Sequence, residues 1–139
     1  GYDGKGQISL KPGDDTAAAW TAIGGQACVL EQRVAFACEL SVLVVRDRNG
    51  VLAAYDSPRN THENGILRRS IVPCGLPDAD LMLARDLAAR IAAALDYVGV
   101  LAVEMFHLGP QAPAAERLMV NEIAPRVHNS GHWTIDACG

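Results

Sequence analysis

The sequence predicts an α+β fold in which a mainly antiparallel sheet packs against helices. Two pairs of β segments, each joined by a turn or a short loop, predict antiparallel hairpins, since such pairs need only short connections. The first pair runs from Glu39 to Tyr55 and the second from Tyr97 to Ala124. Between them, apolar residues at helical spacing predict one long helix over Ala79–Leu95.

Only a turn, a short helix and a short strand are expected in the N-terminal part. Residues 1 to 6 are glycine-rich and predict an ordinary turn, although glycine also lets backbone N–H groups face an anion. Asp14–Thr16 can cap a short alanine-rich helix that runs to about Ile23, where two glycines would end it. A strand is expected at Ala27–Leu30.

The first hairpin is predicted by a run of β-forming residues at Glu39–Arg46. A turn of the Asn-Gly kind at Asp47–Gly50 separates it from the returning segment, Val51–Tyr55. A polar loop is then expected at Asp56–Arg69, and Leu67–Pro73 resumes an extended pattern.

The long helix is expected to have Asp78 as its N-terminal cap. Its apolar stripe predicts a face in the core, made of Leu81, Ala84, Leu87, Ala88, Ile91 and Leu95. A buried strand is expected at Tyr97–Phe106. Gly109–Glu116 reads as a surface loop, and Arg117–Ala124 completes the pair.

Composition and charge argue against several classes of function. The length of 139 residues suggests one domain, and the net charge of −4 gives no argument for binding nucleic acid or an anionic membrane. The four cysteines are too widely spaced for a zinc site or a disulfide framework. No run approaches the ~18 apolar residues of a membrane span, and no signal segment is visible, so a cytoplasmic protein is expected. The chain opens on a loop without an initiator Met, which predicts a fragment of a longer polypeptide.

Asn121–His132 concentrates a carboxylate, a carboxamide, a guanidinium and two imidazoles in consecutive positions. Because side chains alternate along a strand, Glu122 is expected to share a face with the apolar Leu118 and Val120. A lone carboxylate on an inward face is costly unless it is paired or binds a metal. This stretch alone leaves two interpretations open, an ion pair with Arg126 or a binding site.

A second carboxylate, Glu104, lies near the end of the preceding strand. Antiparallel neighbours joined by a loop can bring Glu104 and Glu122 together, as the oxygen ligands of a hard divalent cation require. Without an ion the two carboxylates would repel, and one would have to stay protonated. With Asn121 as a neutral oxygen ligand, the pattern predicts Mg²⁺, or alternatively Mn²⁺, bound together with substrate phosphates. A metal-free domain would need the carboxylates to lie apart or to pair with arginines.

Several motifs, taken in order, resemble the ATP-grasp superfamily. They are Gly-Tyr-Asp-Gly-Lys-Gly-Gln, Glu-Gln-Arg-Val, Glu-Leu-Ser-Val, Asp-Tyr-Val-Gly-Val-Leu-Ala-Val-Glu and Asn-Glu-Ile-Ala-Pro-Arg-Val-His-Asn-Ser-Gly-His-Trp-Thr. Within the superfamily, essentially the whole chain is similar to the 5-(carboxyamino)imidazole ribonucleotide synthases. The specific part is the His-Asn-Ser-Gly-His continuation, because other ATP-grasp enzymes share the Asn-Glu but rarely this extension.

This resemblance implies an ATP-grasp fold and a carbon–nitrogen ligase of purine biosynthesis. ATP would phosphorylate bicarbonate to carboxyphosphate, and the carboxyl group would pass to the amine of 5-aminoimidazole ribonucleotide, releasing ADP and phosphate. The resemblance also implies a remnant of the small lid subdomain at residues 1–31 and a larger subdomain at residues 32–139 that carries the metal and substrate site. A homodimer is implied for the full-length enzyme.

The resemblance further assigns roles position by position. Nucleotide-binding positions are Glu31 and Val34 at the adenine hinge, Glu39 at the ribose hydroxyls and Asn121 beside the phosphates. The metal ligands are Glu104 and Glu122. Substrate-binding positions are Tyr2, Lys5 and Asn129, and catalytic positions are Asp3, Arg126 and His128. Asp3 and His128 are the candidates for proton handling at the aminoimidazole nitrogen, and His132 is expected to be structural.

Two positions depart from the family pattern: Val127 stands where proline is usual, and Arg59 stands where an acidic residue usually precedes Asn60. The family's N-terminal domain and its flanking lysine regions are not in this chain, which is therefore expected to be inactive alone. A related ATP-grasp ribonucleotide formyltransferase that uses formate is an alternative. A non-catalytic Mg·ATP-binding module is another.

Overall fold

The computed structural model describes residues 6–138. Internal contacts divide the chain into two compact units, the first being Gly1–Val34 with Glu63–Ile66 and the second Ala35–His62 with Leu67–Gly139. Within the described residues, no helix is both long and apolar enough to cross a membrane.

The first unit carries the helix α1, Thr16–Ala22. Asp15 caps it as predicted, since its carboxylate accepts two backbone N–H bonds from the first turn, at 2.9 and 3.0 Å. Gly24, with a φ of 92°, follows the end of the helix. The strand predicted at Ala27–Leu30 is not formed, and the side chain of Leu30 is 86% exposed. A strand needs a partner that satisfies its backbone groups, and the described residues around this segment provide none.

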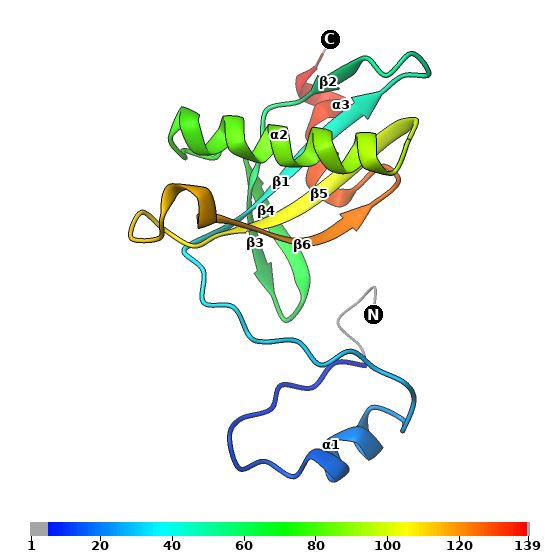
Figure 1. Cartoon of the computed structure of the whole chain (residues 1–139), viewed down its shortest axis with the longest axis vertical. Coiled ribbons are helices and arrows are strands. Elements are labelled where there is room, and N and C mark those ends of the chain that lie inside the picture. The colour runs from blue at the N-terminus through cyan, green and yellow to red at the C-terminus, as the bar shows by residue number, and fades with distance from the viewer. Residues whose placement is uncertain (1–5, 139) are drawn as a thin grey trace. The chain divides into compact units, whose positions relative to one another are not determined.

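An antiparallel sheet forms the body of the second unit (Figure 1). Its strands are β1 (Cys38–Arg46), β2 (Leu52–Ala54), β3 (Arg59–Glu63), β4 (Ile66–Ile71), β5 (Gly99–His107) and β6 (Leu118–Ala124). The order is β4-β3-β1-β5-β6, and β2 also pairs with β1. Both predicted hairpins are confirmed, β1 with β2 and β5 with β6.

The segment predicted as a polar loop, Asp56–Arg69, instead contains the hairpin of β3 and β4. Its two-residue turn is Asn64-Gly65, and both residues have positive φ, 53° and 74°. Such turns match the twist of the flanking strands, and Asn-Gly is their strongest sequence signal. The prediction was wrong because the polar side chains were interpreted as a loop, although this dipeptide favours a hairpin.

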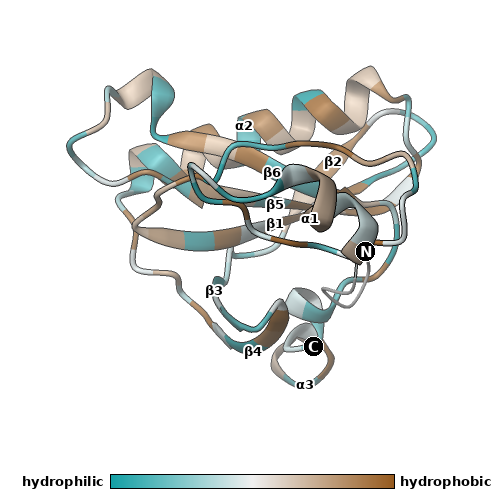
Figure 2. Ribbon diagram, turned by 90° about the horizontal axis from the view of Figure 1, so that it is seen from below, coloured by the Kyte–Doolittle hydropathy of each residue, from teal (hydrophilic) through white to brown (hydrophobic). Residues whose placement is uncertain are grey.

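Helix α2, Asp78–Ala94, lies along one face of the sheet (Figure 2). Its cap residue is Pro77 rather than Asp78, which lies in the first helical turn. The core between helix and sheet consists of Leu40, Val42, Val44, Leu101, Val103, Met105, Ala84, Ala88 and Ala92. Alternate residues of β1 and β5 fill it, as the period of a strand dictates. Leu95, predicted in the apolar stripe, is 55% exposed because it lies just beyond the end of the helix.

A buried polar cluster ties the start of α2 to the β5–β6 hairpin. Asp80 accepts from the ring of His107 at 3.0 Å and from the guanidinium of Arg117 at 3.3 Å. Nδ1 of His107 in turn accepts the backbone N–H of Gly109 at 3.1 Å. The hydrogen bond from His107, together with Arg117, holds the pKa of Asp80 below its usual range.

This cluster predicts a loss of stability in acid. Because the native pKa of Asp80 lies below its unfolded value of about 3.9, the carboxylate stabilises the fold above that pH, and the contribution is lost as the pH falls through the native pKa. We expect the free energy of unfolding in urea to drop more for the wild type than for Asp80→Asn between about pH 5 and about pH 3. Equal drops would contradict this assignment.

Candidate active site

The face of the sheet opposite α2 carries the two predicted carboxylates. Glu104 on β5 pairs directly with Glu122 on β6, and residues that face each other across an antiparallel pair project to the same side. The structure therefore brings the two together, as the hairpin pattern predicted. Glu104 is buried, whereas Glu122 is exposed.

Glu122 reaches this face through an irregularity in β6. The register between β5 and β6 shifts between Glu104 and Met105, because Val120 pairs with Met105 whereas Glu122 pairs with Glu104. Asn121 is thus an extra, bulged residue, and Glu122 projects to the face opposite that of Val120. Simple alternation placed both on one face, which is wrong. Bulges of this kind commonly redirect a side chain next to an active site.

Glu104 lies where a cation would relieve an electrostatic cost. Burial, reinforced by the charges of Glu122 and Glu39, raises the pKa of Glu104, while His62 and a hydrogen bond from Ser41 partly offset this. Its Oε1 atom is buried and has no hydrogen-bond partner among residues 6–138. Buried carboxylate oxygens normally have one, so this pair fits a divalent ion. Among the described residues no group of three or more His, Cys, Asp or Glu side chains surrounds a common point, which leaves further ligands to water or substrate.

His128 approaches the same carboxylate from the turn after β6. Its Nε2 atom lies 3.7 Å from Oε1 of Glu104, and its Nδ1 atom lies 2.9 Å from the hydroxyl of Ser130. Burial, and then the charge of Arg126, lowers the pKa of His128, which favours the neutral imidazole. Gly131 lets this turn pack closely, since a Cβ there would lie 2.5 Å from a methyl carbon of Leu43.

Further along β1, Glu39 is held by a residue that sequence reasoning missed. Nδ1 of His62 lies 2.8 Å from Oε2 of Glu39, and both side chains are largely buried. His62 lies on β3, so the segment predicted as a loop supplies a site residue. The signal that could have found it is the Asn64-Gly65 dipeptide, which predicts the hairpin that places His62 on a strand.

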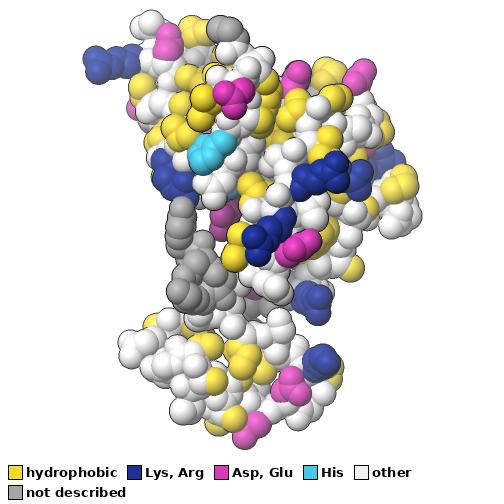
Figure 3. Space-filling model, turned by 180° about the vertical axis from the view of Figure 1, so that it is seen from behind, with side chains coloured by type: hydrophobic (Ala, Val, Ile, Leu, Met, Phe, Trp, Pro, Cys, Tyr) yellow, Lys and Arg dark blue, Asp and Glu magenta, His cyan; other side chains and the backbone are white. Residues whose placement is uncertain are grey.

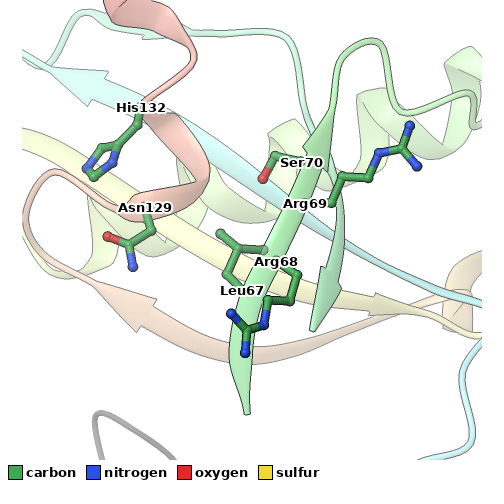
Figure 4. A pocket seen from close by; sticks show the side chains of 6 residues that line it. All are labelled: Leu67, Arg68, Arg69, Ser70, Asn129 and His132. Carbon is green, nitrogen blue, oxygen red and sulfur yellow. The ribbon is translucent and has the colours of Figure 1, made fainter. Parts of the chain in front are cut away.

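A hollow of about 450 Å³ lies between β4 and the turn after β6. It is lined by Leu67, Arg68, Arg69, Ser70, Asn129 and His132 (Figure 4). Asn129 and His132 line it from the C-terminal segment, so His132, expected to be structural, borders this hollow. Basic side chains are exposed on the side of the second unit turned away from α2 (Figure 3).

The remaining predicted positions divide between the units. Glu31 and Val34 belong to the first unit, where Glu31 is exposed and Val34 is partly buried. Asn121, Arg126 and Asn129 belong to the second unit and are exposed. Tyr2, Asp3 and Lys5 lie outside the described residues. The roles of all these residues stay predictions.

This fold agrees with the comparison to protein families. The ATP-grasp domain model matches residues 1–139, and the chain belongs to the ATP-grasp family. The predicted family and the predicted mainly antiparallel fold are thereby confirmed.

Within the family, the chain is similar to several N5-carboxyaminoimidazole ribonucleotide synthases. N5-carboxyaminoimidazole ribonucleotide synthase of Brucella melitensis is 46% identical over 140 residues, which cover 99% of this chain and 37% of that protein. The synthase of Pseudomonas aeruginosa is 46% identical over 136 residues, covering 98% and 36%. The chain therefore spans little more than a third of these relatives.

Solved structures agree with the sequence relatives. Carboxyaminoimidazole ribonucleotide synthase of Aspergillus clavatus complexed with ATP matches with a TM-score of 0.87 at 34% identity, covering 98% of this chain and 34% of that one. A second structure from this organism contains ADP and 5-aminoimidazole ribonucleotide. It matches with a TM-score of 0.65 at 36% identity, covering 73% and 26%.

Proposed function

We propose that this chain is the ATP-binding part of an enzyme that carboxylates 5-aminoimidazole ribonucleotide with ATP and bicarbonate. The observation that carries the proposal is the facing pair Glu104 and Glu122, one of them buried with an unpartnered oxygen, on the open face of an ATP-grasp sheet. The shared name of relatives at 46% identity supports the choice of substrate.

Glu104 and Glu122 would hold Mg²⁺, with Asn121 beside them at the phosphates. When bound, the ion would neutralise charge on the oxygens of the transferred phosphoryl group. Mg²⁺ keeps several waters and binds through one or two carboxylates plus phosphates, which suits a site with only two acidic ligands.

Glu39 would accept hydrogen bonds from the ribose hydroxyls of the nucleotide. Its Oε2 atom is held by His62, and this contact fixes the carboxylate. Glu31 and Val34 would form the adenine hinge. This division assigns the ribose to β1 and the phosphates to β5 and β6.

The two chemical steps would proceed in order. A bicarbonate oxygen attacks the γ-phosphorus of ATP, and the bond to ADP breaks, giving carboxyphosphate. The amine nitrogen of the ribonucleotide then attacks the carboxyl carbon, the bond to phosphate breaks, and the nitrogen loses a proton. Arg126 would offset the phosphoryl charge, and neutral His128 or Asp3 would take the proton. Tyr2, Lys5 and Asn129 would hold the ribonucleotide.

The test is ADP release by the full-length polypeptide supplied with Mg·ATP and 5-aminoimidazole ribonucleotide, with bicarbonate or formate added in turn. We expect turnover only with bicarbonate, and none from the 139-residue chain alone. Turnover that depends on formate would contradict the proposal and identify a formyltransferase. Binding of Mg·ATP without any turnover by the full-length polypeptide would instead identify a nucleotide-binding module.

A further inference from the structure

A row of polar side chains, part-buried at one end and buried at the other, crosses the sheet toward Glu104. Ser70 on β4 donates its hydroxyl to Oδ1 of Asn60 on β3 at 2.8 Å. Nδ2 of Asn60 donates to the hydroxyl of Ser41 on β1 at 2.6 Å. Ser41 faces Glu104 across the β1–β5 pair, so its hydroxyl lies on the same side of the sheet as that carboxylate. Four strands thus contribute one member each.

The direction of these hydrogen bonds depends on the chemistry of the last member. A carboxylate oxygen accepts, so a hydrogen bond between Ser41 and Glu104 would use the proton of the Ser41 hydroxyl. Ser41 is then left as an acceptor, which requires the amide nitrogen of Asn60, and the Asn60 carbonyl oxygen is left for Ser70. Because Ser41 accepts from Asn60, its own proton is available to Glu104, the polar side chain that faces it on β5.

Because Ser41 and Asn60 are buried, bulk water cannot replace their hydrogen bonds. Ser41 is fully buried and Asn60 is 4% exposed. Placing such groups inside a protein costs free energy unless each one is satisfied, and a strand pair can form equally well with apolar residues at these positions. The opposite face of β1 shows this, since Leu40 and Val42 fill it.

We infer that Asn60 is a positioning residue of the metal site, which acts through Ser41 to orient and hold the carboxylate of Glu104. The inference rests on the proposed function, because it assumes that Glu104 binds a divalent ion. It assigns a role to Asn60 that lies beyond contact with nucleotide, bicarbonate or ribonucleotide. Partners of metal ligands typically contribute about 10–100-fold to metal affinity.

The test is Asn60→Asp in the full-length polypeptide. The change keeps the size of the side chain but replaces the amide donor with an acceptor. Residue 60 can then no longer donate a hydrogen bond to the Ser41 hydroxyl. Mn²⁺ affinity, measured by electron paramagnetic resonance with saturating ADP, should fall about 10–100-fold. ADP affinity without metal, measured by calorimetry, should stay unchanged. If Asn60 were only structural, Asn60→Asp would not lower the Mn²⁺ affinity while leaving the ADP affinity unchanged. Thr61→Val, at the exposed neighbouring position of β3, is the matched control and should change neither affinity.

Two further variants make each outcome decisive. Ser41→Ala removes only the hydroxyl that reaches Glu104, and it should weaken Mn²⁺ binding similarly even if Asn60→Asp fails to fold. Glu104→Gln measures the contribution of the ligand itself. Weaker Mn²⁺ binding in Glu104→Gln but not in the Asn60 and Ser41 variants would overturn the inference and leave the proposed function intact. Equal Mn²⁺ binding by the wild type and Glu104→Gln would instead contradict the metal site of the proposed function.

Discussion

Replacing Glu104 with glutamine is expected to reduce ATP turnover by the full-length enzyme about 100- to 1,000-fold. The amide keeps the shape of the side chain but removes the negative charge that, with Glu122, would hold the ion at the phosphates. The buried position of Glu104 strengthens the effect, because little water is available to take the place of the lost ligand. The measurement is steady-state ADP release at saturating ATP and ribonucleotide.

Glu116→Gln is the control for charge removal as such. Glu116 is exposed in the loop between β5 and β6 and has no role in the proposed chemistry, so turnover should stay near the wild-type value. The account of the site would be wrong if Glu104→Gln retained more than about half of the wild-type rate, since one lost transition-state interaction alone costs far more.

Replacing Leu101 with alanine is expected to lower the free energy of unfolding by about 2–5 kcal/mol. Leu101 is fully buried between β5 and α2, where the alanines of the helix leave no larger side chain to fill the space. Urea denaturation monitored by circular dichroism measures the change. Ile135→Ala is the control, because Ile135 is 75% exposed, and its effect should be close to zero. A loss of similar size in both variants would contradict the assigned core.

The sequence was sufficient wherever a local signal decides the structure. The Asp15 cap, the Asn-Gly turn between β1 and β2, and the loop between β5 and β6 each depend on residues close in the chain. The hairpin of β5 and β6 in turn places Glu104 opposite Glu122. The central pair of the candidate site is therefore predictable from the pairing of two neighbouring strands.

Features that depend on contacts across the fold could not be predicted in this way. The bulge at Asn121 arises from pairing with a particular strand, so alternation along β6 alone assigned Glu122 to the wrong face. Asp80 is buried because His107 and Arg117 approach it from the β5–β6 hairpin. The spacing of apolar residues along α2 does not reveal these contacts. The β3–β4 hairpin differs, since its Asn64-Gly65 turn is visible in the sequence.

The most direct test of the central claim is a structure of the full-length polypeptide with Mg·ADP. The account predicts that carboxylate oxygens of both Glu104 and Glu122 coordinate the ion and that the Ser41 hydroxyl donates to Glu104. An ion bound to the phosphates with both carboxylates turned away from it, or paired with arginines instead, would contradict the account.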